Sequence, residues 1–239
     1  MRLYIAGQKY FGQEVFKLAQ RLGHEVVGVC APAHRDERVR LFVGGPNDKP
    51  DRLRAVAQDA GAPWLEAGNL KDDTLPPGVD LIIAAHSHDF IGRKTRLRAR
   101  FGAIGYHPSL LPLHRGRDAV KWAIKLRERV TGGTVFWLND TVDGGPVAAQ
   151  DWCFIRPDDT PDELWRRELQ PMGLRLVERT LKYIAAGVLV QIPQDPALAT
   201  WEPALDPPPL YRPDLAMLGG GWDGYTVVRE REMLRLVGG

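Results

Sequence analysis

The run Glu25–Cys30 (Glu-Val-Val-Gly-Val-Cys) carries too many apolar side chains for a strand with one face in water. Such a run is typical of a strand that is buried on both faces, as in a parallel sheet covered by helices. A first strand is predicted at Arg2–Ala6, and apolar residues at helical spacing predict a helix between the two strands, from Gly12 to Gly23. This strand–helix–strand order indicates an α/β fold.

The chain continues this alternation to about residue 190, and its 44% hydrophobic residues are enough for a sizeable core. We therefore predict an α/β domain over residues 1–190, with a mostly parallel twisted sheet and helices on both faces. A short, irregular, Pro- and Gly-rich C-terminal extension is predicted for residues 191–239. A loop is predicted at 31–49, and two helices are predicted at Asp51–Ala60 and Asp118–Arg129, the second of them capped by Asp118. A long helix opens with a capping box at Thr160 and Glu163 and is kinked at Pro171. The remaining strands are predicted at Pro63–Leu65, Asp80–Ala85, 102–107, Gly132–Leu138, Val147–Ile155 and Tyr225–Val228.

Several site classes lack their sequence signatures. The turn Gly7–Gly12 has neither G-x-G-x-x-G nor the Gly-Lys-Ser/Thr of a P-loop, so a dinucleotide or nucleoside triphosphate site is not supported. A net charge of +2 without a block of like charge indicates no dedicated nucleic-acid face. Cys30 and Cys153 fall in predicted strands, and the spacing of His and Cys fits no zinc site, so we expect neither a disulfide framework nor a metal.

The N-terminal residues indicate where the protein works. They read as a short strand and not as a signal peptide, and no apolar run approaches the roughly 18 residues of a membrane span. We expect a cytoplasmic enzyme without a membrane partner; the sequence does not indicate its oligomeric state.

His107 is predicted to be the last residue of a strand, because Pro108 holds the residue before it in an extended conformation and breaks the ladder. The carboxyl edge of a parallel sheet is where α/β enzymes place their chemistry, and imidazole titrates near neutral pH. Two interpretations stay open for His107 taken alone: a functional imidazole, or a histidine hydrogen-bonded in a rigid turn.

Asp143 is a second candidate. The loops His86–Phe90, His107–Gly116 and Asn139–Pro146 each follow a predicted strand, and we expect them to meet at one edge of the sheet, bringing Asp143 to His107. A histidine and a carboxylate together can carry out general acid–base catalysis. Asp143 taken alone could instead be a turn aspartate bonded to its own backbone, and the loop after residue 85 could be an ordinary polar loop.

The motif His107-Pro-Ser-Leu-Leu-Pro-x-His-Arg-Gly116, with a Trp-containing helix after it and Val-Asp-x-Gly about 36 residues beyond the histidine, resembles the folate-dependent formyltransferase superfamily. The resemblance runs from residue 1 to about residue 195. It is closest to the hydrolase domains of 10-formyltetrahydrofolate dehydrogenases, which share the pattern of Phe11-Gly-Gln-Glu-Val15 and His24-Glu-Val-Val-Gly28, and to methionyl-tRNA formyltransferases.

The resemblance implies a 10-formyltetrahydrofolate donor and a small-molecule acceptor. It implies that His107 polarises the formyl carbonyl or stabilises the oxyanion, while Asp143, with an ordered water, moves the proton from the nucleophile to the leaving nitrogen of the folate. It also implies that the pteridine binds beside two loops, whose residues are His86, Ser87, His88, Asp89 and Phe90 in the first and Leu138, Asn139, Asp140, Thr141 and Val142 in the second.

Gly105 is a departure from the family pattern. Formyltransferases that modify amines usually carry an asparagine two residues before the histidine, and glycine supplies no side-chain amide. The dehydrogenases' hydrolase domain also lacks this asparagine, so a backbone amide, a water or the acceptor could take its place. We expect formyl transfer to a small amine-bearing acceptor; the alternatives are hydrolysis of the donor to tetrahydrofolate and formate, and a non-catalytic folate- or partner-binding protein on the same fold.

Overall fold

The structure, a computed structural model, describes residues 1–34, 49–87 and 89–203. Most of the predicted loop at 31–49, residue His88 and the predicted strand Tyr225–Val228 therefore lie outside the described residues. Residues Met1–Glu202 form one compact unit. Within the described ranges, no helix is long and apolar enough to cross a membrane.

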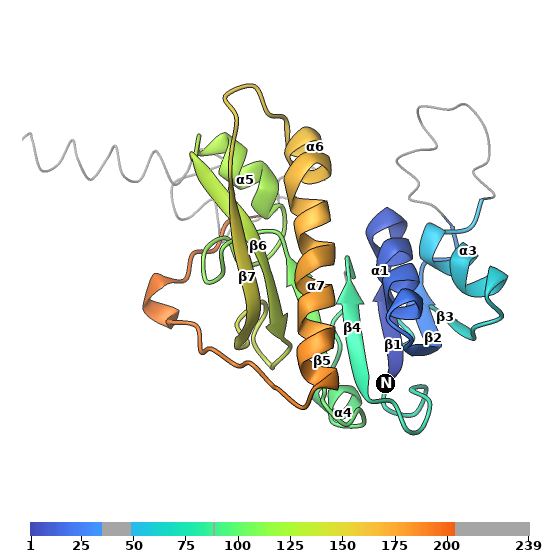
Figure 1. The fold of residues 1–239 in the computed structure, drawn as a ribbon. Coiled ribbons are helices and arrows are strands. Elements are labelled where there is room, and N and C mark those ends of the chain that lie inside the picture. The colour runs from blue at the N-terminus through green and yellow to red at the C-terminus, as the bar shows by residue number, and fades with distance from the viewer. Residues whose placement is uncertain (35–48, 88, 204–239) are drawn as a thin grey trace, which may run out of the picture. The chain divides into compact units, whose positions relative to one another are not determined.

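A mixed sheet organises this unit (Figure 1), with the strand order β3-β2-β1-β4-β5-β6-β7. The first five strands of this order are parallel, and the last two pair antiparallel to their neighbours. The predicted α/β fold with a mostly parallel sheet is confirmed. The strands are β1 (Arg2–Gly7), β2 (Glu25–Ala31), β3 (Trp64–Glu66), β4 (Leu81–Ala85), β5 (Ala103–His107), β6 (Val130–Trp137) and β7 (Val147–Phe154).

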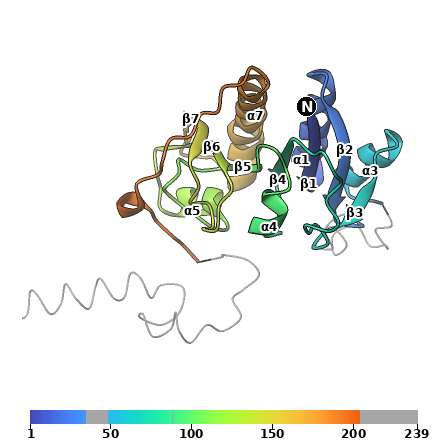
Figure 2. The ribbon, with the colours of Figure 1, turned by 90° about the horizontal axis from the view of Figure 1, so that it is seen from below.

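Two apolar layers cover the faces of the sheet. On one face the buried side chains of α1, α3 and α7 pack on the strands, and Figure 2 shows α7 beside the sheet from another direction. On the other face the cover comes from Leu70, Leu75 and Val79 in the segment before β4, and from Ile91 and Ala99, which lie on either side of α4. The helices are α1 (Lys9–Arg21), α3 (Arg52–Asp59), α4 (Arg93–Arg96), α5 (Ala119–Lys125), α6 (Pro161–Leu164) and α7 (Gln170–Ala185), with a π-helical turn at Trp165–Leu169 and a 3-10 turn at Pro196–Leu198.

Helix α1 begins at Lys9, so the prediction of a start at Gly12 was wrong. Tertiary contacts satisfy its first turn, because the Gln8 N–H donates to the carbonyl of Ala85 and the Lys9 N–H to the carboxylate of Asp51. Gly12 instead allows close packing, since a Cβ there would lie 3.2 Å from the Leu53 side chain.

Helix α5 ends at Lys125, four residues before the predicted end at Arg129. Arg127 has a φ of 55°, a left-handed conformation that ends the helix, and β6 already begins at Val130. Asp118 occupies the N-cap position but is itself left-handed, so its side chain makes no capping bond and the predicted cap was wrong.

The last long helix keeps its predicted start. Thr160 and Glu163 form the reciprocal capping box, with Pro161 at the first helical position. The regular helix is interrupted before Pro171, where the π-helical turn at Trp165–Leu169 separates α6 from α7. A proline lacks an N–H, and a wider turn accommodates it within one helical stack.

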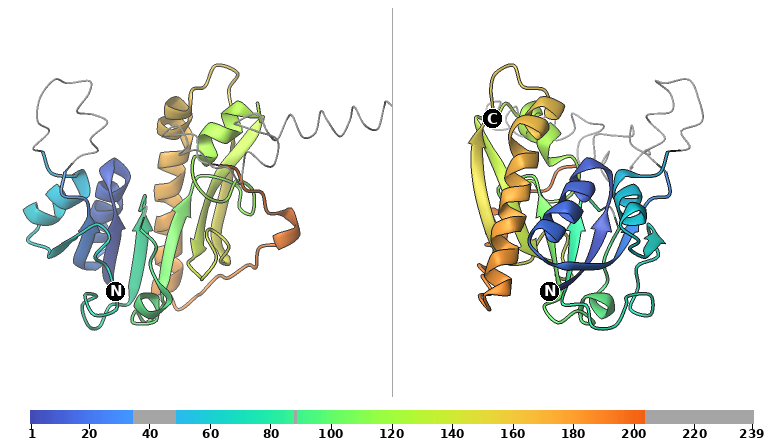
Figure 3. Two further views of the ribbon diagram at one scale, coloured as in Figure 1. Left: turned by 180° about the vertical axis from the view of Figure 1, so that it is seen from behind. Right: turned by 45° about the vertical axis from the view of Figure 1, so that its right-hand side comes forward.

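Residues 188–202 run from the end of α7 past the β6–β7 hairpin, as the orange segment of Figure 3 shows. The Trp137 indole donates to the carbonyl of Val190 at 2.7 Å, and Ile192 pairs antiparallel with Val147. We call this segment the strap. Because most of residues 191–239 lies outside the described residues, the domain boundary at residue 190 stays a prediction.

Candidate active site

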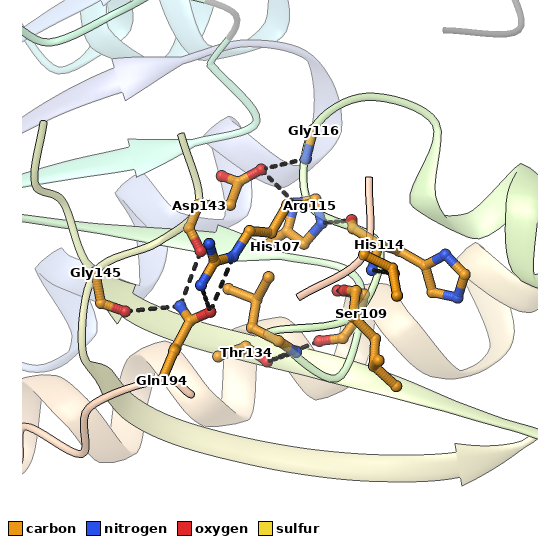
Figure 4. Close-up of polar contacts among 12 residues, drawn as sticks. His107, Ser109, His114, Arg115, Gly116, Thr134, Asp143, Gly145 and Gln194 are labelled. Atoms are coloured by element: carbon orange, nitrogen blue, oxygen red, sulfur yellow. Dashed lines mark hydrogen bonds and ion pairs between the residues drawn. The ribbon is translucent and has the colours of Figure 1, made fainter. Parts of the chain in front are cut away.

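His107 is the last residue of β5, as predicted, and its side chain is buried. Its Nε2 lies 2.6 Å from the carbonyl oxygen of His114 (Figure 4). A carbonyl oxygen can only accept, so Nε2 carries a proton and donates this bond. The tautomer of the neutral ring is thereby fixed, and Nδ1 is left to face the other partner of the site.

The loop from Ser109 to Gly116 is shaped by polar contacts with the β6–β7 hairpin. The Ser109 hydroxyl donates to Leu113 O at 2.6 Å, and its own carbonyl accepts from Thr134 Oγ1 at 2.7 Å. Gln150 in turn donates to Thr134 Oγ1 and to the carbonyl of Leu111. These buried and partly buried bonds hold the loop in the turn that places the His114 carbonyl against His107.

Asp143 completes the predicted pair. Its Oδ2 lies 3.6 Å from His107 Nδ1 and accepts the Gly116 N–H at 2.7 Å. The carboxylate therefore contacts the histidine loop, rather than capping its own turn. Asp143 has a φ of 49°, an uncommon conformation for a non-glycine residue that turns the loop back toward β5.

The reasoning that placed all three loops at one edge of the sheet was wrong for the third. Strand β6 is antiparallel to β5, with Ile104 opposite Trp137 and His107 opposite Thr134. The loop after Trp137 therefore leaves the sheet where β5 begins, at the edge opposite His107. It reaches the histidine because it folds back along the sheet.

The first candidate folate loop follows β4. His86 has a φ of 61°, and its ring centroid lies 5.9 Å from that of Trp165. Asp89 accepts the Gly68 N–H at 2.6 Å and its own N–H is bonded to the Ser87 hydroxyl. Phe90 is two-thirds exposed and offers an apolar surface at this loop.

The second candidate folate loop follows β6. Asn139 Oδ1 accepts the Thr141 N–H at 2.9 Å, which closes a local turn. Asp140 pairs with the buried guanidinium of Arg96 at 2.5 Å, and Val142 is half exposed. Arg96 also donates to the carbonyl of Ile91, so one side chain ties this loop to the end of the first.

The formyl transferase family matches residues 5–180 of the chain. The chain belongs to this family. The resemblance seen in the His-Pro-Ser-Leu-Leu-Pro motif is confirmed. The family uses 10-formyltetrahydrofolate as its formyl donor.

Sequence similarity to individual proteins supports membership of the same family. Mitochondrial 10-formyltetrahydrofolate dehydrogenase of Homo sapiens is 32% identical over 212 residues, which cover 84% of this chain and 22% of that protein. Methionyl-tRNA formyltransferase of Anaeromyxobacter dehalogenans is 30% identical over 209 residues, covering 84% of this chain and 64% of that protein. The chain thus spans about a fifth of the dehydrogenase and under two thirds of the tRNA enzyme.

The fold is shared with solved structures. Glycinamide ribonucleotide transformylase 1 of Symbiobacterium toebii has a TM-score of 0.63 at 21% identity, covering 82% of this chain and 94% of that chain. The fold of the family, and with it the mixed sheet that carries His107, is therefore present here.

The described residues fit a folate-type donor in two respects. Arg96 joins Asp140 of the second candidate folate loop to Ile91, the residue that follows the first, and each loop exposes an apolar side chain, Phe90 in one and Val142 in the other. Apolar surface with a few convergent polar groups is what a heterocyclic ligand needs.

Gly105 faces apolar side chains. A Cβ at this position would lie 3.1 Å from Leu138 Cδ2 and 3.4 Å from Phe136 Cε1. The space that an asparagine side chain would need is thus already occupied in part by Leu138. The expectation that a backbone N–H, a water or the acceptor takes the place of the missing amide stays a prediction.

Tyr106, next to His107, points to the other face of the sheet. Its hydroxyl donates to the carbonyl of Leu169 at 2.6 Å, and burial raises the pKa of the phenol far above its ordinary value. Tyr106 therefore remains a neutral donor and takes no part in acid–base chemistry near neutral pH.

Three residues at the site were not predicted as site residues: His114, Arg115 and Gln194. The first two stand inside the quoted motif, so their place in the loop was visible but their partners were not. Gln194 donates to the carbonyls of Asp143 and Gly145, and it lies in a Pro-rich stretch without periodicity. Nothing in the sequence around Gln194 signals this role.

Proposed function

We propose that the chain transfers the formyl group of 10-formyltetrahydrofolate to a small amine-bearing acceptor, with His107 and Asp143 as its catalytic pair. The observation that carries the proposal is the pairing of His107 Nδ1 with the Asp143 carboxylate at 3.6 Å, while Nε2 is already engaged. Nδ1 is then the ring atom available to the reacting group.

Attack of the amine on the formyl carbon forms a tetrahedral intermediate whose oxygen is negatively charged. His107 in its doubly protonated form donates from Nδ1 to this oxygen, because Nε2 is already engaged with the His114 carbonyl. Asp143 accepts the proton of the attacking amine, through an ordered water, and returns it to the folate nitrogen as that bond breaks. The Gly116 N–H holds the carboxylate in place for this transfer.

The second candidate is hydrolysis of the donor to tetrahydrofolate and formate. The observation that favours it is Gly105, where apolar contacts with Leu138 and Phe136 stand in place of the family's amide. An amine acceptor loses an orienting group there, whereas water is small and needs less orientation.

The test is to incubate the protein with 10-formyltetrahydrofolate and follow the release of tetrahydrofolate, with and without a set of small amines. Turnover only with an amine supports transfer, and turnover without one supports hydrolysis. We expect His107→Asn and Asp143→Asn each to lower kcat by a factor of about 10² or more, as loss of a general acid or base does. Donor binding without turnover under any condition would show a binding protein and overturn both enzymatic readings.

A further inference from the structure

Gln194 of the strap makes hydrogen bonds to both loops of the candidate active site (Figure 4). Its Nε2 donates to the carbonyl oxygens of Asp143 at 2.8 Å and Gly145 at 2.7 Å. Its Oε1 accepts from Nε of Arg115 at 3.2 Å and from a terminal guanidinium nitrogen at 2.7 Å. One half-buried amide thus uses both donors and its acceptor between two loops.

The Asp143 side of this contact restrains the backbone. Asp143 is held in a left-handed conformation, which non-glycine residues adopt only when their surroundings favour it. Gln194 binds the carbonyl of that residue and the carbonyl two residues later, so it fixes the peptide groups that aim the Asp143 side chain.

The Arg115 side fixes the histidine loop. The guanidinium of Arg115 is buried and bound to Gln194, and its neighbours His114 and Gly116 contact His107 and Asp143 directly. An immobilised Arg115 therefore sets the positions of the His114 carbonyl, which binds His107, and of the Gly116 N–H, which binds Asp143.

The far end of the strap is anchored to the same loop. Thr200 accepts the His114 N–H with its hydroxyl at 2.7 Å and the Arg115 N–H with its carbonyl at 3.0 Å. The His114 ring lies between carboxylates of Glu128 and Glu202, at 2.9 and 3.0 Å. Gln194 therefore sits on a segment that is held at both ends.

We infer that Gln194 is a positioning residue, whose amide sets the separation of His107 and Asp143 for the proposed reaction. It binds the main chain of Asp143 and not the carboxylate, and it has no titratable group, so it acts through Asp143. This inference deepens the proposed function and rests on it.

Gln194→Glu is the sharpest variant. A glutamate of the same shape can still accept from Arg115, with a stronger charge-assisted bond, but it cannot donate to the two carbonyls. The substitution therefore removes the hydrogen bonds to the carbonyls of Asp143 and Gly145 and keeps those from Arg115. Asp195→Ala is the matched control, because Asp195 lies next in the strap and only caps the turn at Ala197.

We expect Gln194→Glu to lower kcat about 10-fold or more, with an unchanged dissociation constant for tetrahydrofolate. Asp195→Ala should leave kcat at the wild-type value. If Gln194 acts through Asp143, its effect disappears in an Asp143→Asn background, because the two changes are then not additive. Equal losses in both backgrounds, or a wild-type kcat in Gln194→Glu, would overturn the inference.

Amide hydrogen exchange separates this inference from the proposed function. The Gly116 N–H donates to the Asp143 carboxylate, so its exchange rate reports whether the two loops stay together. We expect exchange at Gly116 to be at least about 10-fold faster in Gln194→Glu and unchanged in Asp195→Ala. Faster exchange in a protein without turnover would overturn the proposed reaction alone; unchanged exchange would overturn the positioning role.

Discussion

Gly105 lies two residues before His107 on the same face of β5, and the apolar side chains that cover it decide what a larger residue can do there. Because strand residues alternate between faces, an asparagine at Gly105 would enter the space beside the imidazole. Leu138 and Phe136 stand at 3.1 and 3.4 Å from the position of its Cβ.

We expect Gly105→Asn to lower the free energy of unfolding by about 1–3 kcal/mol, as overpacking of a core does. Leu138→Ala opens the space, so the Asn substitution should cost less in that background and show more formyl transfer there. Urea denaturation and the tetrahydrofolate assay measure both quantities. A single Gly105→Asn variant as stable as the wild type would contradict this reading.

His107 and Asp143 were predicted as a pair from the sequence because each stands in a local signal, His-Pro at a strand end and Val-Asp-Gly-Gly in a loop. Gln194 was not predicted, since it is separated from Asp143 by 51 residues and its contacts are with backbone carbonyls. Every residue type carries the same backbone carbonyl, so no sequence pattern indicates which carbonyl a side chain will bind.

At the scale of elements, the start of a helix could be predicted from the sequence only where residues of its own first turn make the hydrogen bonds that cap it. The capping box at Thr160 and Glu163 satisfies the first turn of α6 from within, and its position was predicted. The start of α1 at Lys9 depends on Ala85 and Asp51, which lie in other elements, so the sequence placed it too late.

The same capping box predicts a pH dependence. Hydrogen bonds from the Thr160 hydroxyl and N–H lower the pKa of the Glu163 carboxyl. A carboxyl with a lowered pKa in the folded protein stabilises it fully above its ordinary pKa, and this stabilisation is lost as pH falls through the lower value. The contribution of Glu163 should therefore decline below about pH 4.

Glu163→Gln keeps an acceptor for Thr160 but removes the charge. We expect this variant to be less stable than the wild type at pH 7 and equally stable at strongly acidic pH, as measured by urea unfolding at a series of pH values. Thr160→Ala removes the two hydrogen bonds of the hydroxyl, keeps the backbone N–H that donates to Glu163, and serves as the reference. A difference between wild type and Glu163→Gln that is independent of pH would refute the role of charge.

At the scale of the whole molecule, both cysteines lie buried in the sheet. Burial, with the nearby Asp89 carboxylate, raises the pKa of the Cys30 thiol to about 11. Burial, with Glu168 nearby, likewise raises the pKa of Cys153 to about 11. Only the thiolate is an effective nucleophile, and roughly one thiol in a thousand is ionised at about pH 8.

We expect the native protein to react very slowly with a thiol reagent such as Ellman's reagent at pH 8, and both thiols to react at once in urea. The rate should follow the opening of the sheet, so a tetrahydrofolate complex would react still more slowly. Rapid labelling of a thiol in the native state would show that the strand is accessible. Cys30→Ser and Cys153→Ser identify which thiol reacts.

The C-terminal limit of the compact unit gives a further prediction. A chain that ends at residue 190 lacks the pairing of Ile192 with Val147 and the bonds of Gln194, whereas a chain that ends at residue 203 keeps them. We expect the shorter chain to lose tetrahydrofolate-releasing activity by more than about 10-fold and the longer to keep it, each measured against the full chain. Equal activities would place the boundary at residue 190, as the composition alone predicts.

The strap also has a consequence for how the protein comes into being. A ribosome delivers the chain from its N-terminus, and the sheet with His107 and Asp143 is complete by the end of β7. Gln194 leaves the ribosome later, so all the strands of the sheet are synthesised before the amide that joins the two loops. If Gln194 has the positioning role inferred above, the chain becomes competent for the proposed reaction only after all the strands of the sheet have been synthesised.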